Sequence, residues 1–251
     1  MKRWSAVVAA VLLVAAVSLM ISMGAAAQEV IRVGADTAFP PFEFVDEATG
    51  EYTGFDMDLI RAIGEQMGVK VEIVNTVFDS LIPALLLGEF DVIVSAMTIT
   101  EERAQTVAFT DPYFRTGLVI ATRPDNTSIK TTDDLKGKIV AVQMGSTGHF
   151  AADALPGVGR VDPYQFVDQA MTAVIIGAAD AAILDELVAI EYMQAHPASI
   201  KVVGEPFTTE EYGMAVRPSD TELLQRINAA LAELRANGTY DQLYEKWFGV
   251  D

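Results

Sequence analysis

The side chains that most often carry catalysis or hold metal ions are scarce in this chain. It has no cysteine, and its two histidines, His149 and His196, have no second histidine at metal-ligand spacing. The chain contains neither a G-x-S-x-G turn nor a phosphate-binding P-loop. We therefore expect no metal site, cofactor, disulfide, lipid-bearing cysteine, or serine or cysteine nucleophile.

Two other groups of residues could do chemistry, and neither is specific by itself. Gly145, Ser146, Thr147 and Gly148 join a predicted strand to a predicted helix, so their backbone N–H groups could meet an anion. An ordinary strand–helix turn is the competing interpretation. Asp56 and Asp58 could form an acid pair, but a spacing of two points them apart on a helix. We expect these carboxylates to cap that helix instead.

The elements that must position these residues alternate between strands and helices. Residues 55–67 place apolar side chains at a spacing of four, which predicts one buried helix face. Repeated strand–helix–strand alternation predicts an α/β fold with parallel sheets covered by helices on both faces. The predicted strands are 30–35, 69–74, 91–95, 117–122, 138–142, 164–167, 181–184, 200–203 and 212–217. The predicted helices are 55–67, 80–87, 147–154, 169–177, 186–194, 221–235 and 240–248.

Composition and charge narrow the classes of partner. The chain has 251 residues, 51% of them apolar, with 17 Lys and Arg against 35 Asp and Glu and a net charge of −18. The apolar content is sufficient for a sizeable core. The acidity argues against binding to nucleic acid or to anionic lipid surfaces, because both need clustered basic residues.

The first 27 residues have the pattern of an export signal. Lys2 and Arg3 precede an apolar run over residues 6–23, and three small residues, 25–27, end the pattern. We expect cleavage before Gln28 and a periplasmic protein that is not lipid-anchored. A retained membrane anchor is the alternative, since the run is nearly long enough to span a bilayer.

Five segments, in order along the chain, resemble family 3 of the extracellular solute-binding proteins, the polar amino-acid receptors of ABC importers. They are ADTAFPPFEF (35–44), GFDMDL (54–59), SAMTITEER (95–103), FTDPY (109–113) and NGTYDQLYEKWFG (237–249). The resemblance covers essentially the whole chain after residue 27 and points in particular to the glutamine- and arginine-binding members.

The resemblance implies the two-lobed type II periplasmic binding protein fold, an α/β architecture with the ligand in a cleft between the lobes. Lobe 1 would comprise residues 28–112 and 214–251, and lobe 2 residues 118–208. Two hinge strands, 113–117 and 209–213, would absorb closure of the cleft.

The resemblance also implies how the α-carboxylate and α-ammonium of an amino acid would be bound. Arg103, from a T-x-T-x-x-R pattern, would pair with the carboxylate through its two-pronged guanidinium. Asp185 and the peptide unit of Ala96 would receive the ammonium. The hydroxyl of Thr98 would assist Arg103 at the carboxylate, and the N–H groups of the turn at Ser146 and Thr147 would meet the carboxylate from lobe 2. From spacing alone, a surface Arg103 paired with a neighbouring glutamate and a helix-capping Asp185 remain open.

At the side-chain end, the resemblance implies contacts from Asp36, Phe39, Phe78 and Gln143. The two phenylalanines could sandwich an amide, a guanidinium or an aliphatic stem, with core packing as the alternative. Three positions depart from the glutamine-specific pattern: Gln143 replaces a lysine, Leu184 a histidine and Ala96 a glycine. These departures leave both arginine and glutamine open, and an acidic ligand would face Asp36 unpaired.

Together these observations predict a monomeric, non-enzymatic protein that captures glutamine or arginine and delivers it to a membrane permease. The alternative is an exported enzyme similar to cyclohexadienyl dehydratases, which would need a general acid in the cleft. We favour the binding protein because no additional basic residues stand out for a dicarboxylate substrate.

Overall fold

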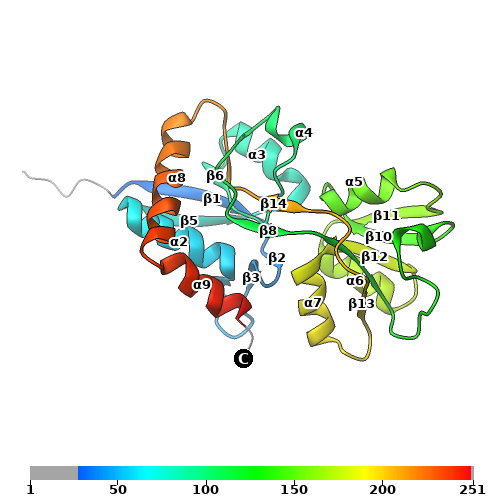
Figure 1. The fold of residues 1–251 in the computed structure, drawn as a ribbon. Helices are drawn as coiled ribbons and strands as arrows, with labels where there is room; N and C mark the ends of the chain where they lie inside the picture. The colour runs from blue at the N-terminus through cyan, green and yellow to red at the C-terminus, as the bar shows by residue number, and fades with distance from the viewer. Residues whose placement is uncertain (1–27, 250–251) are drawn as a thin grey trace, which may run out of the picture.

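The computed structural model describes residues 28–249 and contains two five-stranded sheets at opposite ends of an elongated molecule (Figure 1). The predicted signal peptide lies outside the described residues. Between residues 28 and 249, no helix is long and apolar enough to cross a lipid bilayer. The α/β class predicted from the alternating pattern is observed.

The first sheet has the strand order β5-β1-β6-β15-β7. Its strands are β1 (Val30–Ala35), β5 (Lys70–Asn75), β6 (Val92–Ile93), β7 (Ala108–Phe109) and β15 (Ala215–Val216). β1 runs parallel to β5 and β6, whereas β15 inserts antiparallel between β6 and β7. The sheet therefore contains strands from both ends of the chain.

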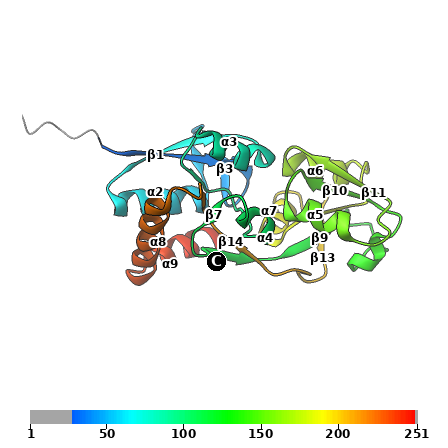
Figure 2. The ribbon, with the colours of Figure 1, turned by 90° about the horizontal axis from the view of Figure 1, so that it is seen from above.

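Helices cover both faces of this sheet. They are α2 (Phe55–Met67), α3 (Leu81–Leu87), α8 (Thr221–Ala236) and α9 (Thr239–Phe248). Figure 2 shows α2, α8 and α9 on one side of β1 and α3 on the other. Alternation along β6 explains this layering, because Val92 packs in the cluster with α2 and α8 while Ile93 packs in the cluster with α3.

A small antiparallel sheet, absent from the predictions, stands beside the first sheet. It consists of β2 (Ala38–Phe39), β3 (Glu43–Val45) and β4 (Tyr52–Thr53). The run FPPFEF folds back between β2 and β3 and brings Phe39 opposite Glu43. These strands are too short for a clear sequence period, but they fix two side chains of the site described below.

The second sheet has the order β11-β10-β12-β9-β13. Its strands are β9 (Leu118–Thr122), β10 (Ile139–Gln143), β11 (Arg160–Tyr164), β12 (Ala181–Asp185) and β13 (Lys201–Val203). Its helices are α5 (Thr147–Ala154), α6 (Val167–Ile175) and α7 (Glu186–Ala195). β10 is parallel to β11 and β12, whereas β9 is antiparallel to β12 and β13.

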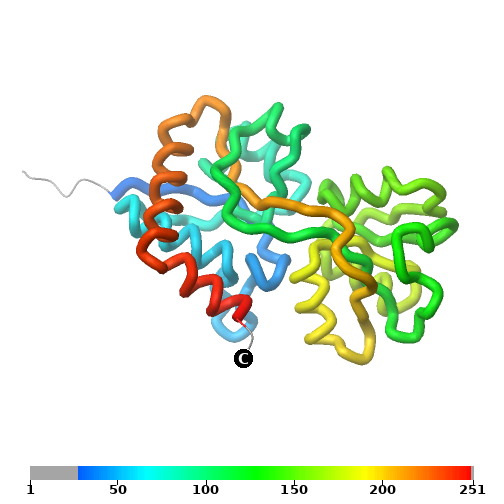
Figure 3. The backbone as a smooth tube through the Cα atoms, viewed as in Figure 1, coloured from blue at the N-terminus to red at the C-terminus, as the bar shows by residue number. Residues whose placement is uncertain are grey.

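Two antiparallel strands, β8 (Phe114–Thr116) and β14 (Glu210–Tyr212), lie between the sheets and pair with each other. Figure 3 shows these segments side by side as the chain passes to the second half and returns. Their role as hinge strands, like the limits of the two lobes, stays a prediction.

Three expectations about the elements need correction. Both sheets are mixed rather than all parallel, because β9 and β15 enter them antiparallel. The strand predicted at 164–167 lies earlier, at Arg160–Tyr164, because this edge strand is polar and carries Pro163, and α6 begins at Val167. The strand predicted at 212–217 is divided into β14 and β15 by Gly213 and Met214.

Candidate functional site

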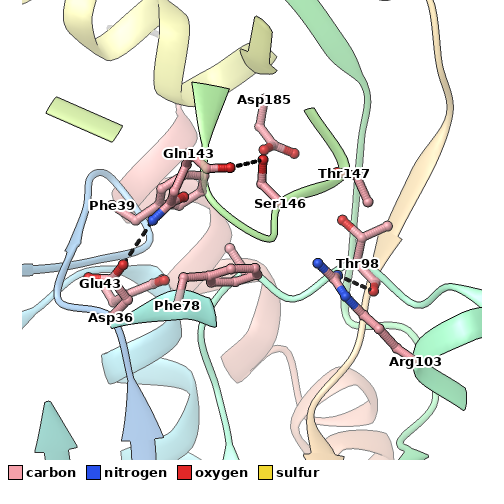
Figure 4. Close-up of a pocket in the computed structure, with 11 residues that line it drawn as sticks. Asp36, Phe39, Glu43, Phe78, Thr98, Arg103, Gln143, Ser146, Thr147 and Asp185 are labelled. Carbon is pink, nitrogen blue, oxygen red and sulfur yellow. Dashed lines mark hydrogen bonds between the residues drawn. The ribbon is translucent and has the colours of Figure 1, made fainter. Parts of the chain in front are cut away.

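A small cavity lies where the two halves of the molecule meet, and all ten predicted site residues line it. The lining side chains come from both halves of the molecule, on either side of β8 and β14, and Glu43 is an eleventh lining residue (Figure 4). The cavity has about 20 Å³ of room for the centres of water molecules, enough for one or two waters. The lining residues are Asp36, Phe39, Glu43, Phe78, Ala96, Thr98, Arg103, Gln143, Ser146, Thr147 and Asp185.

Strand ends explain this convergence. Asp36 follows β1, Gln143 is the last residue of β10 and Asp185 is the last residue of β12. β10 and β12 are parallel, so their carboxyl ends meet at one edge of the second sheet. That edge faces the carboxyl end of β1 in the first half. Crevices at the carboxyl ends of strands are the usual ligand sites of open α/β sheets.

Arg103 reaches across the junction between the halves. It sits on α4 (Glu101–Ala104), a one-turn helix capped by Thr100, whose hydroxyl accepts from the Arg103 N–H at 3.1 Å. The guanidinium donates to the Thr98 carbonyl at 2.7 Å and to the Gly145 carbonyl at 3.0 Å. Its Cζ atom lies 5.3 Å from the centre of the Phe78 ring. Arg103 is thus buried, not a surface residue paired with a neighbouring glutamate.

Asp185 occupies the capping position of α7 but makes no capping bond with its side chain. Instead, its Oδ1 accepts a 2.6 Å hydrogen bond from the hydroxyl of Tyr212 on β14. Burial, and to a smaller extent the nearby charge of Glu210, raise the pKa of Asp185 to about 7. A cation in the cavity would favour the ionised form of this carboxyl group.

The turn after β10 carries the other two side chains that the second half places in the cavity, Ser146 and Thr147. The Ser146 hydroxyl caps α5 by accepting from the His149 N–H at 3.1 Å, and it donates to the Gln143 carbonyl at 2.9 Å. Thr147 starts the helix, and its hydroxyl donates to Glu210 Oε2 at 2.8 Å. The hydroxyl of Thr98 donates to the same oxygen at 2.7 Å.

At the other end of the cavity, two buried carboxyl groups lie close to one amide. Gln143 Nε2 donates to Asp36 Oδ2 at 2.8 Å. Ser95 links the two acids, since its Oγ accepts from the Asp36 N–H at 2.9 Å and donates to Glu43 Oε1 at 2.8 Å. Asp36 Oδ1 has no hydrogen-bond partner among residues 28–249, and Glu43 Oε2 has none there apart from the adjoining carboxyl group of Asp56. Burial raises the pKa of Asp36 to about 7 and that of Glu43 well above its usual range.

Asp56 departs from its predicted role as a helix cap. It is fully buried, and its Oδ2 accepts from the Ala96 N–H at 2.8 Å and from the Tyr113 hydroxyl at 2.6 Å. These bonds hold the loop after β6, where Ala96 has a φ of +44°. Burial raises the pKa of Asp56 to about 7. Asp58, by contrast, binds Lys246 and Trp247 near the surface.

Sequence reasoning missed two carboxyl groups of the site. Glu43 lies within FPPFEF, where a single charge between two phenylalanines is a signal of a buried functional acid. Glu210 lies in a polar stretch that reads as an ordinary boundary between elements, so nothing in the sequence singled it out. The pairing of β14 with β8 and its bridge from Tyr212 to Thr98 place Glu210 beside the cavity.

Comparisons with known proteins find similarity to extracellular solute-binding proteins in both sequence and structure. Residues 31–250 match the model of bacterial extracellular solute-binding proteins, family 3. The chain is 36% identical to the ABC transporter arginine-binding protein 1 of Escherichia coli (strain K12), over 94% of this chain and 98% of that protein. A structure of an ancestral arginine-binding protein bound to arginine is 46% identical, with a TM-score of 0.86 over 88% of this chain and 99% of that one. An ancestral arginine-binding protein bound to glutamine gives the same identity and TM-score, over 89% and 99%.

Proposed function

The chain belongs to family 3 of the bacterial extracellular solute-binding proteins, and from this premise we propose that it captures L-arginine and presents it to an ABC permease. The family and the relatives identify the chain as a polar amino-acid binding protein of an ABC transporter. The prediction of a binding protein rather than a dehydratase-like enzyme is confirmed by relatives named as binding proteins. The predicted two-lobed fold is confirmed as well.

The observation that carries the choice of arginine is the acidic end of the cavity. Asp36 Oδ1 is buried without a hydrogen-bond partner among the described residues, and Glu43 Oε2 has none in that part of the chain apart from the adjoining carboxyl group of Asp56. A guanidinium offers five N–H donors to these oxygens, and its positive charge would favour the ionised form of both acids. Gln143, where glutamine-specific members carry a lysine, adds no competing positive charge. Phe39 and Phe78 line the same region, and the Phe78 ring already contacts the guanidinium of Arg103.

The opposite end of the cavity suits an α-amino acid. Arg103 is the cation for the ligand carboxylate, and its guanidinium must exchange the Gly145 carbonyl for that carboxylate. Asp185 is the anion for the ammonium, with the Ala96 carbonyl and the Thr98 hydroxyl oxygen as further acceptors. Burial of both ligand charges is favourable only when each is paired.

Entry of arginine requires bonds across the cavity to break, because about 20 Å³ cannot hold an amino acid. Those bonds are Gln143 to Asp36 and Arg103 to the Gly145 carbonyl. We propose that bending at β8 and β14 separates the halves and that ligand contacts close them again. Residues 1–27 would act as a cleaved signal that delivers the protein to the periplasm.

Glutamine is a second candidate, supported by one observation. Because burial raises the pKa of Asp36 to about 7, this group is partly protonated at neutral pH and could donate to an amide oxygen. Two buried acidic side chains, Asp36 and Glu43, nevertheless suit the five donors and the charge of arginine better than the two donors of glutamine.

A thermal-shift screen against the twenty amino acids, followed by calorimetry, tests the proposal. The protein is first unfolded and refolded to remove ligand carried through purification. L-arginine at 100 times its dissociation constant should stabilise the protein by about 2.7 kcal/mol. Tighter binding of glutamine or of an acidic amino acid would contradict the assignment of arginine.

A further inference from the structure

Glu210 is a buried carboxyl group between the two halves of the molecule. It begins β14, one of the two connecting strands, and is 6% exposed. Thr98 in the first half and Thr147 in the second both donate to its Oε2, at 2.7 and 2.8 Å. The hydroxyl of Thr208 lies 3.4 Å from its other oxygen. One oxygen on a connecting strand therefore receives a hydrogen bond from each half.

The direction of these hydrogen bonds fixes what the threonines can offer a ligand. A carboxylate oxygen can only accept, and each hydroxyl has one proton. Both protons are therefore used on Glu210. The hydroxyl oxygens of Thr98 and Thr147, which line the cavity, can present only lone pairs to it. Lone pairs suit an ammonium group and not a carboxylate, so we assign the Thr98 hydroxyl, expected at the ligand carboxylate, to the ammonium instead.

Charges around Glu210 agree with this arrangement. The negative charge of Glu210 raises the pKa of Asp185, because the two carboxyl groups lie near each other. The same charge favours the protonated form of Arg103 and so acts to raise its pKa. A ligand ammonium placed between Asp185 and the threonine oxygens would meet acceptors on several sides. The hydroxyl protons, which would repel it, point away toward Glu210.

We propose that Glu210 is a positioning residue that turns both threonine hydroxyls into acceptors for the α-ammonium and joins the two halves around the bound amino acid. The inference rests on the proposed function of the same cavity. It concerns the α end of the ligand, which all L-amino acids share, so it holds whether arginine or glutamine is bound.

The test is a double-mutant comparison of L-arginine affinity by calorimetry. Glu210→Met removes the acceptor that holds both threonine hydroxyl protons. It should weaken L-arginine binding about 10- to 100-fold, because the two hydrogen bonds from the charged ligand ammonium to the threonine oxygens are lost. Glu210→Gln keeps an acceptor oxygen and should stay within about threefold of the unchanged protein. Glu211→Met is the matched control, because Glu211 is the next residue on β14 and pairs with Arg115 at the surface. It should leave affinity unchanged.

The same Glu210→Met change is then made in a protein carrying both Thr98→Val and Thr147→Val. There it should cause no further loss, or even a gain, because a buried carboxylate without donors is costly. An equal loss in both backgrounds would show that Glu210 acts only on the fold and would overturn the inference. If Glu210→Met does not fold, the two valine variants decide, since unchanged affinity in both would overturn it too.

The unchanged protein separates this inference from the proposed function. If it binds glutamine instead of arginine, the same comparison is made with L-glutamine. If it binds no L-amino acid, the proposed function is wrong and the inference falls with it. Normal binding together with equal losses in both backgrounds overturns the inference alone.

Discussion

At the scale of single residues, the cavity has one cation and several acids, so individual side chains should have separable effects. Arg103 donates to two carbonyls and lines the cavity, and we assign it the ligand carboxylate. Asp36, at the far end, faces the ligand side chain in our proposal. Substitutions at the two ends should therefore differ in whether their effect depends on the ligand.

Arg103→Lys keeps the charge but removes the two-pronged donor. We expect it to weaken arginine and glutamine equally, by about 10- to 100-fold, because the carboxylate is common to both. Calorimetry with each ligand measures the change. Arg115→Lys serves as control, since Arg115 pairs with Glu211 at the surface. Unaltered affinity in Arg103→Lys would remove Arg103 from the site.

Asp36→Asn should discriminate between ligands. It removes a buried negative charge that a guanidinium would pair with, so arginine should lose at least about tenfold more affinity than glutamine. The two dissociation constants, measured by calorimetry on one preparation, give the ratio. Equal losses would place the ligand side chain elsewhere.

At the scale of elements, the loop after β6 carries backbone strain. Ala96 has a φ of +44°, a left-handed conformation that costs a non-glycine residue roughly 1–2 kcal/mol. Ala96→Gly relieves this cost but adds about 0.5–1 kcal/mol of chain entropy. We expect a net stabilisation of about 0.5–1 kcal/mol in urea unfolding. Ala152→Gly, in the regular helix α5, should destabilise by about 1 kcal/mol or more. Destabilisation by both changes would refute the strain.

The elements best predicted from sequence are those with a clear apolar pattern. The helix Phe55–Met67 has its predicted bounds because its apolar residues recur at a spacing of four, and the strand Val30–Ala35 has its predicted bounds as a short apolar run. The short strands β2 and β3 have no predicted counterpart, since two or three residues give no period and tertiary pairing forms them. By contrast, β14 lies within the strand 209–213 that the family resemblance implies. The edge strand β11 was misplaced because it is polar.

The residues of the site also fall into a group that was predicted from the sequence and a group that was not. The ten predicted residues were found through a family resemblance, and the structure brings them to one cavity, although their contacts with a ligand stay predictions. Glu210 and the role of Asp56 could not be read from the sequence. Their partners, Thr147 and Tyr113, are 63 and 57 residues away, and only folding places them together.

At the scale of the whole molecule, several buried acids should make stability depend on pH. Burial raises the pKa of Asp36, Asp56 and Asp185 to about 7 from an ordinary value of 3.8. An acid whose pKa is higher in the folded protein than in the unfolded chain contributes stability that is fully present below the pKa of the unfolded chain. That stability is lost as the pH rises through the pKa of the folded protein. Each pKa unit corresponds to about 1.4 kcal/mol. We therefore expect the protein without ligand to lose stability as pH rises from about 4 to about 7, the range between the unfolded and folded pKa values of these acids.

Arginine should oppose this loss. A bound guanidinium and ammonium favour the ionised acids, so stabilisation by arginine should grow from pH 5 to pH 8 and binding should release protons. Urea unfolding at four pH values, with and without arginine, measures both trends. Calorimetry in buffers of different ionisation enthalpy counts the protons. Stability that rises with pH in the absence of ligand would contradict the raised pKa values.

The position of β15 has a consequence for how the polypeptide acquires its shape during synthesis. This strand lies between β6 and β7, yet it is encoded more than a hundred residues after them. The second sheet, by contrast, uses only the continuous stretch 118–203. As the nascent polypeptide emerges amino end first, the later half has all its strands before the earlier half does. Until residues 215–216 arrive, the flank of β6 is an unpaired edge open to mistaken partners, which makes prompt delivery of the carboxyl-terminal segment a safeguard against aggregation.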